Sequence, residues 1–407
     1  MMRRLTADLA QGITLHAVRF LVAPDKFKGS LTARVAADAM AAGVRVVLPA
    51  AEIDLCPLAD GGEGTLDALI TATGGRVEWL EVCGPLPGMR VRAPLGWLPD
   101  DRTAIVELAT ASGLQLLAHE QRDPTRTTTF GTGELIAYAV SRGATRVIVG
   151  VGGSATCDGG LGLAQACGAS IRLRNGKSYA AGDRKLTGAD TLKVVRIGRR
   201  EGSAESPEAV LRYAGVEIVA ACDVGNLLFG PDGAAHVFAP QKGATPAQAK
   251  RLDDGLRSLA GRLGLDKIAD TPGAGAGGGV GFGLTGLFGA RAVSGAAVVF
   301  DHVDLAARLR GVDWCLTGEG RFDRQSLSGK APVAVARACR AAGVPCVVIA
   351  GSVGDGIAAA HAEGVTAVLS MLTRPMALVE AADHAAELLL QATEQWARVI
   401  AAAGDRS

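Results

Sequence analysis

The segment 147–162, VIVGVGGSATCDGGLG, decides the fold class of this chain. The β-branched run Val147–Val149 predicts a buried strand, and the apolar segment Leu161–Cys167 predicts a helix. A glycine-rich turn between a parallel strand and a helix can direct backbone N–H groups at an anion, because glycine has no Cβ to block close approach. The alternative is a tight turn that binds nothing. The candidate phosphate-binding residues are Gly152, Gly153, Ser154, Thr156 and Asp158.

Composition and length favour an α/β fold with more than one domain. The chain has 407 residues, of which 48% are hydrophobic and only 4% aromatic, which fits aliphatic strands and alanine-rich helices. The 55 glycines occur in clusters, as expected for many tight turns. A net charge of +1, without a basic run, argues against nucleic acid and anionic membranes as partners.

Cysteine usage and the N-terminus predict a cytoplasmic protein. The eight cysteines form no CxxC pair, which is typical of reduced, buried thiols. No apolar run reaches the length of a membrane span. Residues 1–16 read as a loosely held extension, because polar residues interrupt any signal-like segment.

Two strand–loop–helix patterns open the chain. Val18–Ala23 predicts a strand, and Lys28 follows it shortly before the next helix. Glu52–Leu58 predicts a second strand, after which Asp60 and Glu63 flank two glycines. Two carboxylates in one turn suit Mg²⁺ or a general base. The alternatives are that Lys28 is simply solvated and that Asp60 and Glu63 stabilise the start of the following helix.

The pattern changes at residue 77. Short β-rich runs without intervening helices predict an antiparallel section and the start of a different domain. Further along, a strand ends at Asp223, His236–Ala239 predicts a short strand, and 247–264 predicts an amphipathic helix. The segment 272–290 contains GxGxxG but follows Thr-Pro rather than a strand. We expect it to be a mobile segment that approaches other backbone closely.

Alternation of strands and helices resumes in the last part of the chain. Val312–Leu316 predicts a strand, and the loop 317–330, TGEGRFDRQSLSGK, follows it. So many charges in one loop are costly unless they pair with a ligand or with each other. We favour the ligand; an internal salt-bridge cluster is the alternative. The charged candidates in this loop are Glu319, Arg321, Asp323 and Lys330.

Together these strand ends carry the parts needed for phosphoryl transfer: carboxylates for a metal, cations for developing charge and glycine N–H groups for phosphate. No Walker A motif is present. Two other classes stay open. Gly150, Gly152 and Ala155 match GxGxxA, which allows an NAD(P)-dependent 2-hydroxy-acid oxidoreductase. A non-catalytic two-domain protein that binds an organic acid is the other.

The ordered motifs resemble those of the bacterial glycerate kinases of glyoxylate and galactarate degradation. They are APDKFKGSL (23–31), ADGGEGT (59–65), TTFGTGELI (128–136), GGSATCDGG (152–160), CDVGNLLFGPDGA (222–234), FAPQKGA (238–244), PGAGAGGGVG (272–281), TGEGRFDRQSLSGK (317–330) and IAGS (349–352). Three positions depart from the family pattern: Lys26 replaces Ser, Cys157 replaces Asn and Leu228 replaces Pro. We expect the leucine to loosen its turn.

The resemblance implies transfer of the ATP γ-phosphoryl group to D-glycerate, with Mg²⁺, giving 2-phosphoglycerate or its 3-isomer. It also implies a Rossmann-like parallel-sheet domain from both chain ends (17–76 and 290–407) and an inserted mixed α/β domain (77–289), with the active site between them. A homodimer is a candidate assembly. The candidate catalytic residues are Lys28, Asp60, Glu63, Asp223, Arg321 and Lys330, and the candidate metal ligands are Glu319 and Asp323.

Overall fold

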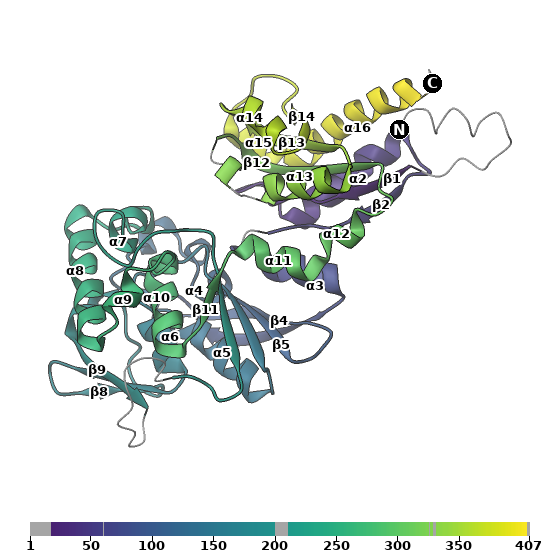
Figure 1. Ribbon diagram of the computed structural model, residues 1–407. Helices are drawn as coiled ribbons and strands as arrows, with labels where there is room; N and C mark the ends of the chain where they lie inside the picture. The colour runs from purple at the N-terminus through teal and green to yellow at the C-terminus, as the bar shows by residue number, and fades with distance from the viewer. Residues whose placement is uncertain (1–17, 60, 200–210, 325, 329–330, 405–407) are drawn as a thin grey trace. The chain divides into compact units, whose positions relative to one another are not determined.

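The computed structural model describes residues 18–59, 61–199, 211–324, 326–328 and 331–404 (Figure 1). The chain divides into two compact units, each with its own sheet. The first unit combines the chain up to Asp60 with Asp67–Ala72 and Val299–Ser407. The second unit combines Gly61–Leu66 with Thr73–Val298.

The first unit contains a five-stranded, wholly parallel sheet in the order β14-β13-β12-β1-β2. If the five strands are renumbered 1 to 5 along the chain and the sheet is read from β2 to β14, the order is 2-1-3-4-5, that of a doubly wound fold. The strand order reverses direction between β1 and β12, which is the switch point of the sheet. The predicted parallel-sheet domain built from both chain ends is therefore confirmed. Its strands are β1 (Arg19–Val22), β2 (Glu52–Leu55), β12 (Trp314–Phe322), β13 (Cys346–Val353) and β14 (Val365–Ser370).

Helices cover both faces of this sheet (Figure 1). On one face, α2 (Ala33–Val47) and α16 (Ala385–Gly404) cover a hydrophobic core. In this core the rings of Phe20 and Trp396 pack edge to face, with their centroids 6.0 Å apart. α2 begins after Thr32, whose hydroxyl accepts a hydrogen bond from the Val35 N–H. α13 (Ala331–Ala342) packs on β12 and β13. The other helices that include residues of this unit are α3 (Thr65–Thr73), α11 (Gly295–Val303), α12 (Leu305–Arg308), α14 (Ile357–Ala362) and α15 (Leu378–Asp383).

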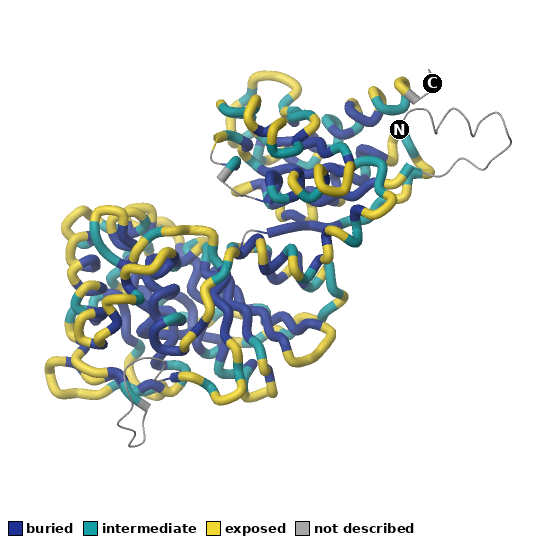
Figure 2. Tube along the Cα trace, in the orientation of Figure 1, coloured by how far each residue is buried: buried dark blue, intermediate teal, exposed yellow. Residues whose placement is uncertain are grey.

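The second unit contains a six-stranded mixed sheet in the order β11-β10-β6-β5-β4-β3. The predicted antiparallel section forms β3 and β4, whereas β5, β6, β10 and β11 are parallel. Its central strands are buried (Figure 2). The strands are β3 (Arg76–Cys83), β4 (Arg90–Trp97), β5 (Thr103–Glu107), β6 (Arg146–Gly150), β10 (Glu217–Ala221) and β11 (Arg291–Val293).

A small three-stranded sheet and several helices complete the second unit. The small sheet is β7 (Ala169–Leu173), β8 (Ser178–Tyr179) and β9 (Val194–Arg199). The helices are α4 (Leu108–Ser112), α5 (Phe130–Ser141), α6 (Leu161–Ala166), α7 (Ala234–Phe238), α8 (Pro246–Leu263), α9 (Asp266–Ala269) and α10 (Ala276–Phe288). No helix among the described residues is long and apolar enough to cross a membrane.

Three local predictions were wrong. The expected strand His236–Ala239 is instead the end of α7, which stops at Phe238, since an apolar run this short does not distinguish a strand from a helix. The expected loop after Leu316 continues as strand to Phe322. The expected mobile segment 272–290 contains the buried helix α10. The expected close approach is correct, because a Cβ on Gly278 would lie 1.9 Å from the Thr156 carbonyl oxygen.

Candidate active site

In the first unit, candidate residues meet at the carboxyl ends of β1 and β12, the switch point of the sheet. The Asp25 N–H donates to the Gly318 carbonyl at 2.8 Å, which fixes the loop after β1 against β12. A Cβ on Gly320 would lie 3.1 Å from the backbone nitrogen of Lys28. Glycine at this position therefore lets β12 approach the loop after β1. Lys28 therefore lies beside the strand that carries Glu319 and Arg321. Open α/β sheets bind ligands at this position.

Two carboxyl groups are buried at this edge. Asp25 is 5% exposed and Glu319 is 6% exposed. Asp25 lies within the motif 23–31, but we did not single it out from the sequence. Its place directly after a predicted strand was the pattern that could have identified it. Buried carboxylates at adjacent strand ends are the oxygen donors that a hard cation prefers.

Arg321 and Asp323 form an ion pair with each other. The Arg321 Nε lies 2.8 Å from Asp323 Oδ2, and the arginine side chain is exposed while the aspartate is largely buried. The alternative of an internal salt bridge is thus realised for this pair. Arg321 still presents an exposed guanidinium at the sheet edge. Asp60 and Lys330, the other candidates in these loops, lie outside the described residues.

In the second unit, the turn Gly61–Gly64 packs against the ends of β6 and β10. A Cβ on Gly61 would lie 3.0 Å from the Ala221 carbonyl oxygen, and one on Gly152 would lie 2.6 Å from the Gly62 Cα. Glycine at 152 is therefore required by the protein's own backbone. The exposed residue Glu63 belongs to this turn, so it lies at the same edge as the glycine-rich loop.

Asp223 follows β10, at the carboxyl ends of the strands of the second sheet, and accepts hydrogen bonds from the residues at the start of α11. Its Oδ1 accepts hydrogen bonds from the Ser294 hydroxyl at 2.6 Å and the Gly295 N–H at 3.0 Å. The residue is nevertheless exposed. The structure thus brings Glu63, Asp223 and the glycine-rich loop to one sheet edge, where strand ends gather ligands.

Asp158 lies inside the glycine-rich loop rather than on its surface. Its carboxylate accepts hydrogen bonds from the N–H and hydroxyl of Thr129, both at 2.9 Å, and from the amides of Gly160 and Gly162, both at 3.1 Å. Burial raises the pKa of Asp158, against the effect of these donors. The amides at the start of α6 therefore bind the chain's own carboxylate, which leaves the exposed Gly153 as the accessible part of the loop.

Lys242 is the principal residue that the sequence did not identify as part of the site. It is 3% exposed, and its ammonium donates hydrogen bonds to the Ser154 hydroxyl and the Thr156 carbonyl, both at 2.7 Å. The Thr156 hydroxyl in turn donates to the Gly277 carbonyl at 3.3 Å. Burial lowers the pKa of Lys242 to about 8. A lysine is usually exposed, so no sequence pattern indicated this buried position.

Comparisons with known proteins identify the family of this chain. The family model for the glycerate kinase family matches residues 20–401. A glycerate kinase from Halalkalibacterium halodurans is 41% identical over 93% of this chain and 97% of its own length. The Escherichia coli protein named glycerate 2-kinase is 39% identical over 94% of this chain and 98% of its own length.

A solved structure extends the comparison to the fold. A crystal structure assigned to glycerate kinase 2 of Salmonella typhimurium LT2 matches with a TM-score of 0.77 and 38% identity. The match covers 96% of this chain and 100% of that one. The chain belongs to the glycerate kinase family.

Proposed function

We propose that the protein transfers the γ-phosphoryl group of ATP to the 2-hydroxyl of D-glycerate and releases 2-phosphoglycerate. The observation that carries this proposal is the match to the glycerate kinase family along residues 20–401. The relative named glycerate 2-kinase supports the choice of hydroxyl. Carboxylates, cations and glycine amides, the groups that phosphoryl transfer needs, occur among the residues that follow the strands of each sheet.

Cations at the first-unit edge stabilise negative charge on the substrates. Lys28 and Arg321 are exposed at the ends of β1 and β12, and Lys330 follows in the same sequence motif. We assign these three side chains to the carboxylate of glycerate and to the oxygens of the transferred phosphoryl group. An arginine is suited to a carboxylate or phosphate, because its planar guanidinium can donate two parallel hydrogen bonds.

The acidic residues fit a magnesium ion. At the first edge the oxygen donors are Glu319, Asp25 and Asp323, and at the second they are Glu63 and Asp223. Bound Mg²⁺ would neutralise charge on the phosphates of ATP. We assign Glu319 and Asp323 to this ion. We propose Asp60 as the base that accepts the proton of the glycerate hydroxyl, and Glu63 and Asp223 as further candidates for this role or for Mg²⁺ binding.

The glycine-rich loop holds phosphate through its backbone. Gly152 and Gly153 offer backbone amides at its accessible part. The buried Lys242 ammonium donates hydrogen bonds to the Ser154 hydroxyl and the Thr156 carbonyl. Lys242 contributes positive charge beneath the loop without reaching the surface. Asp158 acts as a positioning residue, because its four hydrogen bonds fix the shape of the loop.

An ADP-release assay with a panel of hydroxy acids tests the proposal. We expect ADP formation that requires D-glycerate and Mg²⁺ and exceeds the rate with ATP alone. The same panel with NAD⁺ or NADP⁺, followed by absorbance of the reduced cofactor, tests the oxidoreductase class. Acid-dependent reduction of the cofactor without ADP release would overturn the proposal. Binding of glycerate without either reaction would favour the non-catalytic class.

A further inference from the structure

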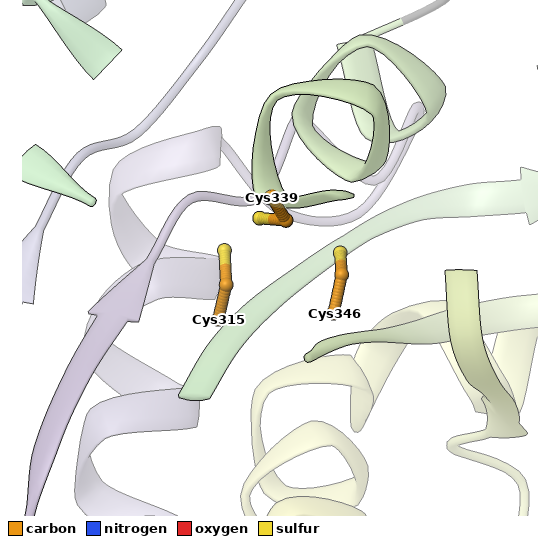
Figure 3. Close-up of side chains that lie close together, drawn as sticks. All are labelled: Cys315, Cys339 and Cys346. Carbon is orange, nitrogen blue, oxygen red and sulfur yellow. The ribbon is translucent and has the colours of Figure 1, made fainter. Parts of the chain in front are cut away.

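A cluster of three cysteines lies in the first unit, between the sheet and α13. Cys315 on β12 and Cys346 on β13 are register partners on adjacent parallel strands. Cys339 comes from α13, and the three sulfur atoms all lie within 4.8 Å of one another. Figure 3 shows the three side chains directed toward a common space.

The sequence pattern explains why these side chains meet. Leu316 and Val347, the residues that follow Cys315 and Cys346, belong to the core on the α2 and α16 face. Because successive side chains of a strand alternate between faces, the two cysteines face the other side, where α13 packs. Cys339 completes the buried stripe of that helix. All three cysteines are 0% exposed.

We propose that Cys315, Cys339 and Cys346 form a closed three-sulfur site for a soft, thiophilic metal ion, Cu(I). If the three sulfur atoms stood 4.8 Å apart, the centre of their triangle would lie about 2.8 Å from each sulfur. An inward shift of each sulfur by about 0.5 Å would then give a metal–thiolate distance of about 2.3 Å. Soft thiolates select Cu(I), zinc or iron–sulfur clusters. This inference does not depend on the proposed reaction.

Two features favour Cu(I) over zinc. Structural zinc almost always has four protein ligands, whereas no fourth His, Cys, Asp or Glu joins the three cysteines among the residues searched, which are those the structure describes. Catalytic zinc needs an open position for water, and these sulfurs are buried. Each metal–thiolate bond that forms releases one proton to solvent. No electron is transferred, so binding requires no oxidant or reductant.

Binding would join the end of α13 to two strands of the sheet. β12 continues from Cys315 to Glu319 and Arg321, so the ion would also stiffen the strand that carries these candidate site residues. A ligand that binds only the folded state raises stability by mass action. We therefore expect Cu(I) to raise the melting temperature of the protein.

The test is an oxygen-free titration of the reduced full-length chain with Cu(I) against a chromophoric Cu(I) chelator. We expect one Cu(I) per chain, and at least a tenfold loss of affinity in Cys339→Ala. Cys56→Ala is the matched control, since Cys56 is also in the first unit, 0% exposed and outside the cluster. The control should keep the affinity of the unchanged protein.

X-ray absorption of the Cu(I)-loaded unchanged protein keeps the test independent of how the variants fold. Three sulfur neighbours around copper support the proposal. Failure of the reduced protein to compete for Cu(I) would overturn it, as would equal affinity in a folded Cys339→Ala variant. Nitrogen or oxygen neighbours in place of the sulfurs would overturn it too.

Discussion

The Lys242 ammonium lies 2.7 Å from the Ser154 hydroxyl, so a buried lysine supports the glycine-rich loop from within the second unit. Lys242→Met removes this support and leaves the Thr156 carbonyl without its donor. A lost partner at a buried polar group costs about 1–3 kcal/mol. We expect at least a tenfold lower kcat/KM for ATP in steady-state kinetics.

The matched control for this change is Lys250→Met. Lys250 is exposed on α8 and pairs with Asp254 one helical turn away. Its loss should leave kcat/KM within about twofold, because exposed ion pairs contribute little. Equal kinetics for the two variants would contradict the role assigned to Lys242.

The same lysine predicts a pH-dependent stability. Burial lowers the pKa of Lys242 from 10.5 to about 8 in the folded protein. Between these pH values the unfolded chain binds more protons at this residue, so its contribution to the free energy of unfolding rises with pH. Below pH 8 both states are protonated and the cost of burying the charge is fully present.

Comparison with Lys242→Met isolates this effect. The difference in unfolding free energy between the unchanged protein and the variant should shift by about 3 kcal/mol between pH 7 and pH 10.5, in favour of the unchanged protein. Denaturant unfolding across this range measures it. Parallel pH profiles for the two proteins would contradict a lowered pKa of Lys242 in the folded state.

Glu319→Gln tests the carboxylates at the first-unit edge. The substitution keeps the size of this buried side chain but removes a charged oxygen donor that suits Mg²⁺. We expect the Mg²⁺ concentration for half-maximal activity to rise at least tenfold. Glu52→Gln is the control, because Glu52 is exposed at the first residue of β2, away from the carboxyl ends of the strands. An unchanged Mg²⁺ dependence in Glu319→Gln would remove it from the metal site.

Gly152→Ala tests the packing of the two loops in the second unit. The new Cβ would lie 2.6 Å from the Gly62 Cα, and a backbone atom cannot move aside as a flexible side chain can. We expect a destabilisation of about 1–3 kcal/mol, typical of overpacking, together with a loss of activity. Gly182→Ala is the control in calorimetry and kinetics, since nothing lies within 4 Å of its added Cβ. Equal melting temperatures would contradict the close contact.

The sequence predicted the parts of the fold that depend on local pattern. The β-branched run Val147–Val149 lies in β6, and the helix predicted after the glycine-rich turn forms α6. The Thr128–Thr129 region shows the limit of local rules. Thr129 directly precedes α5, yet its hydroxyl donates to Asp158, 29 residues away in sequence, instead of capping the helix. The domain boundaries at residues 17, 77 and 290 stay a prediction.

The parts that could not be predicted depend on contacts between distant segments. Lys242 and Ser154 are 88 residues apart, and no periodic pattern links them. Leu228 was expected to loosen its turn because it replaces proline. Instead its N–H donates to the Ala269 carbonyl at 3.1 Å, a bond that proline cannot make. Such pairings follow from the packing of the whole unit.

The most direct test of the central claim is phosphorus NMR of the purified protein with ATP, Mg²⁺ and D-glycerate, followed by addition of enolase. We predict a new phosphomonoester resonance, absent from an ATP-only control, which enolase converts directly to phosphoenolpyruvate. That result identifies 2-phosphoglycerate as the product. A monoester that enolase leaves unchanged would contradict transfer to the 2-hydroxyl, and the absence of any new monoester would contradict the kinase assignment itself.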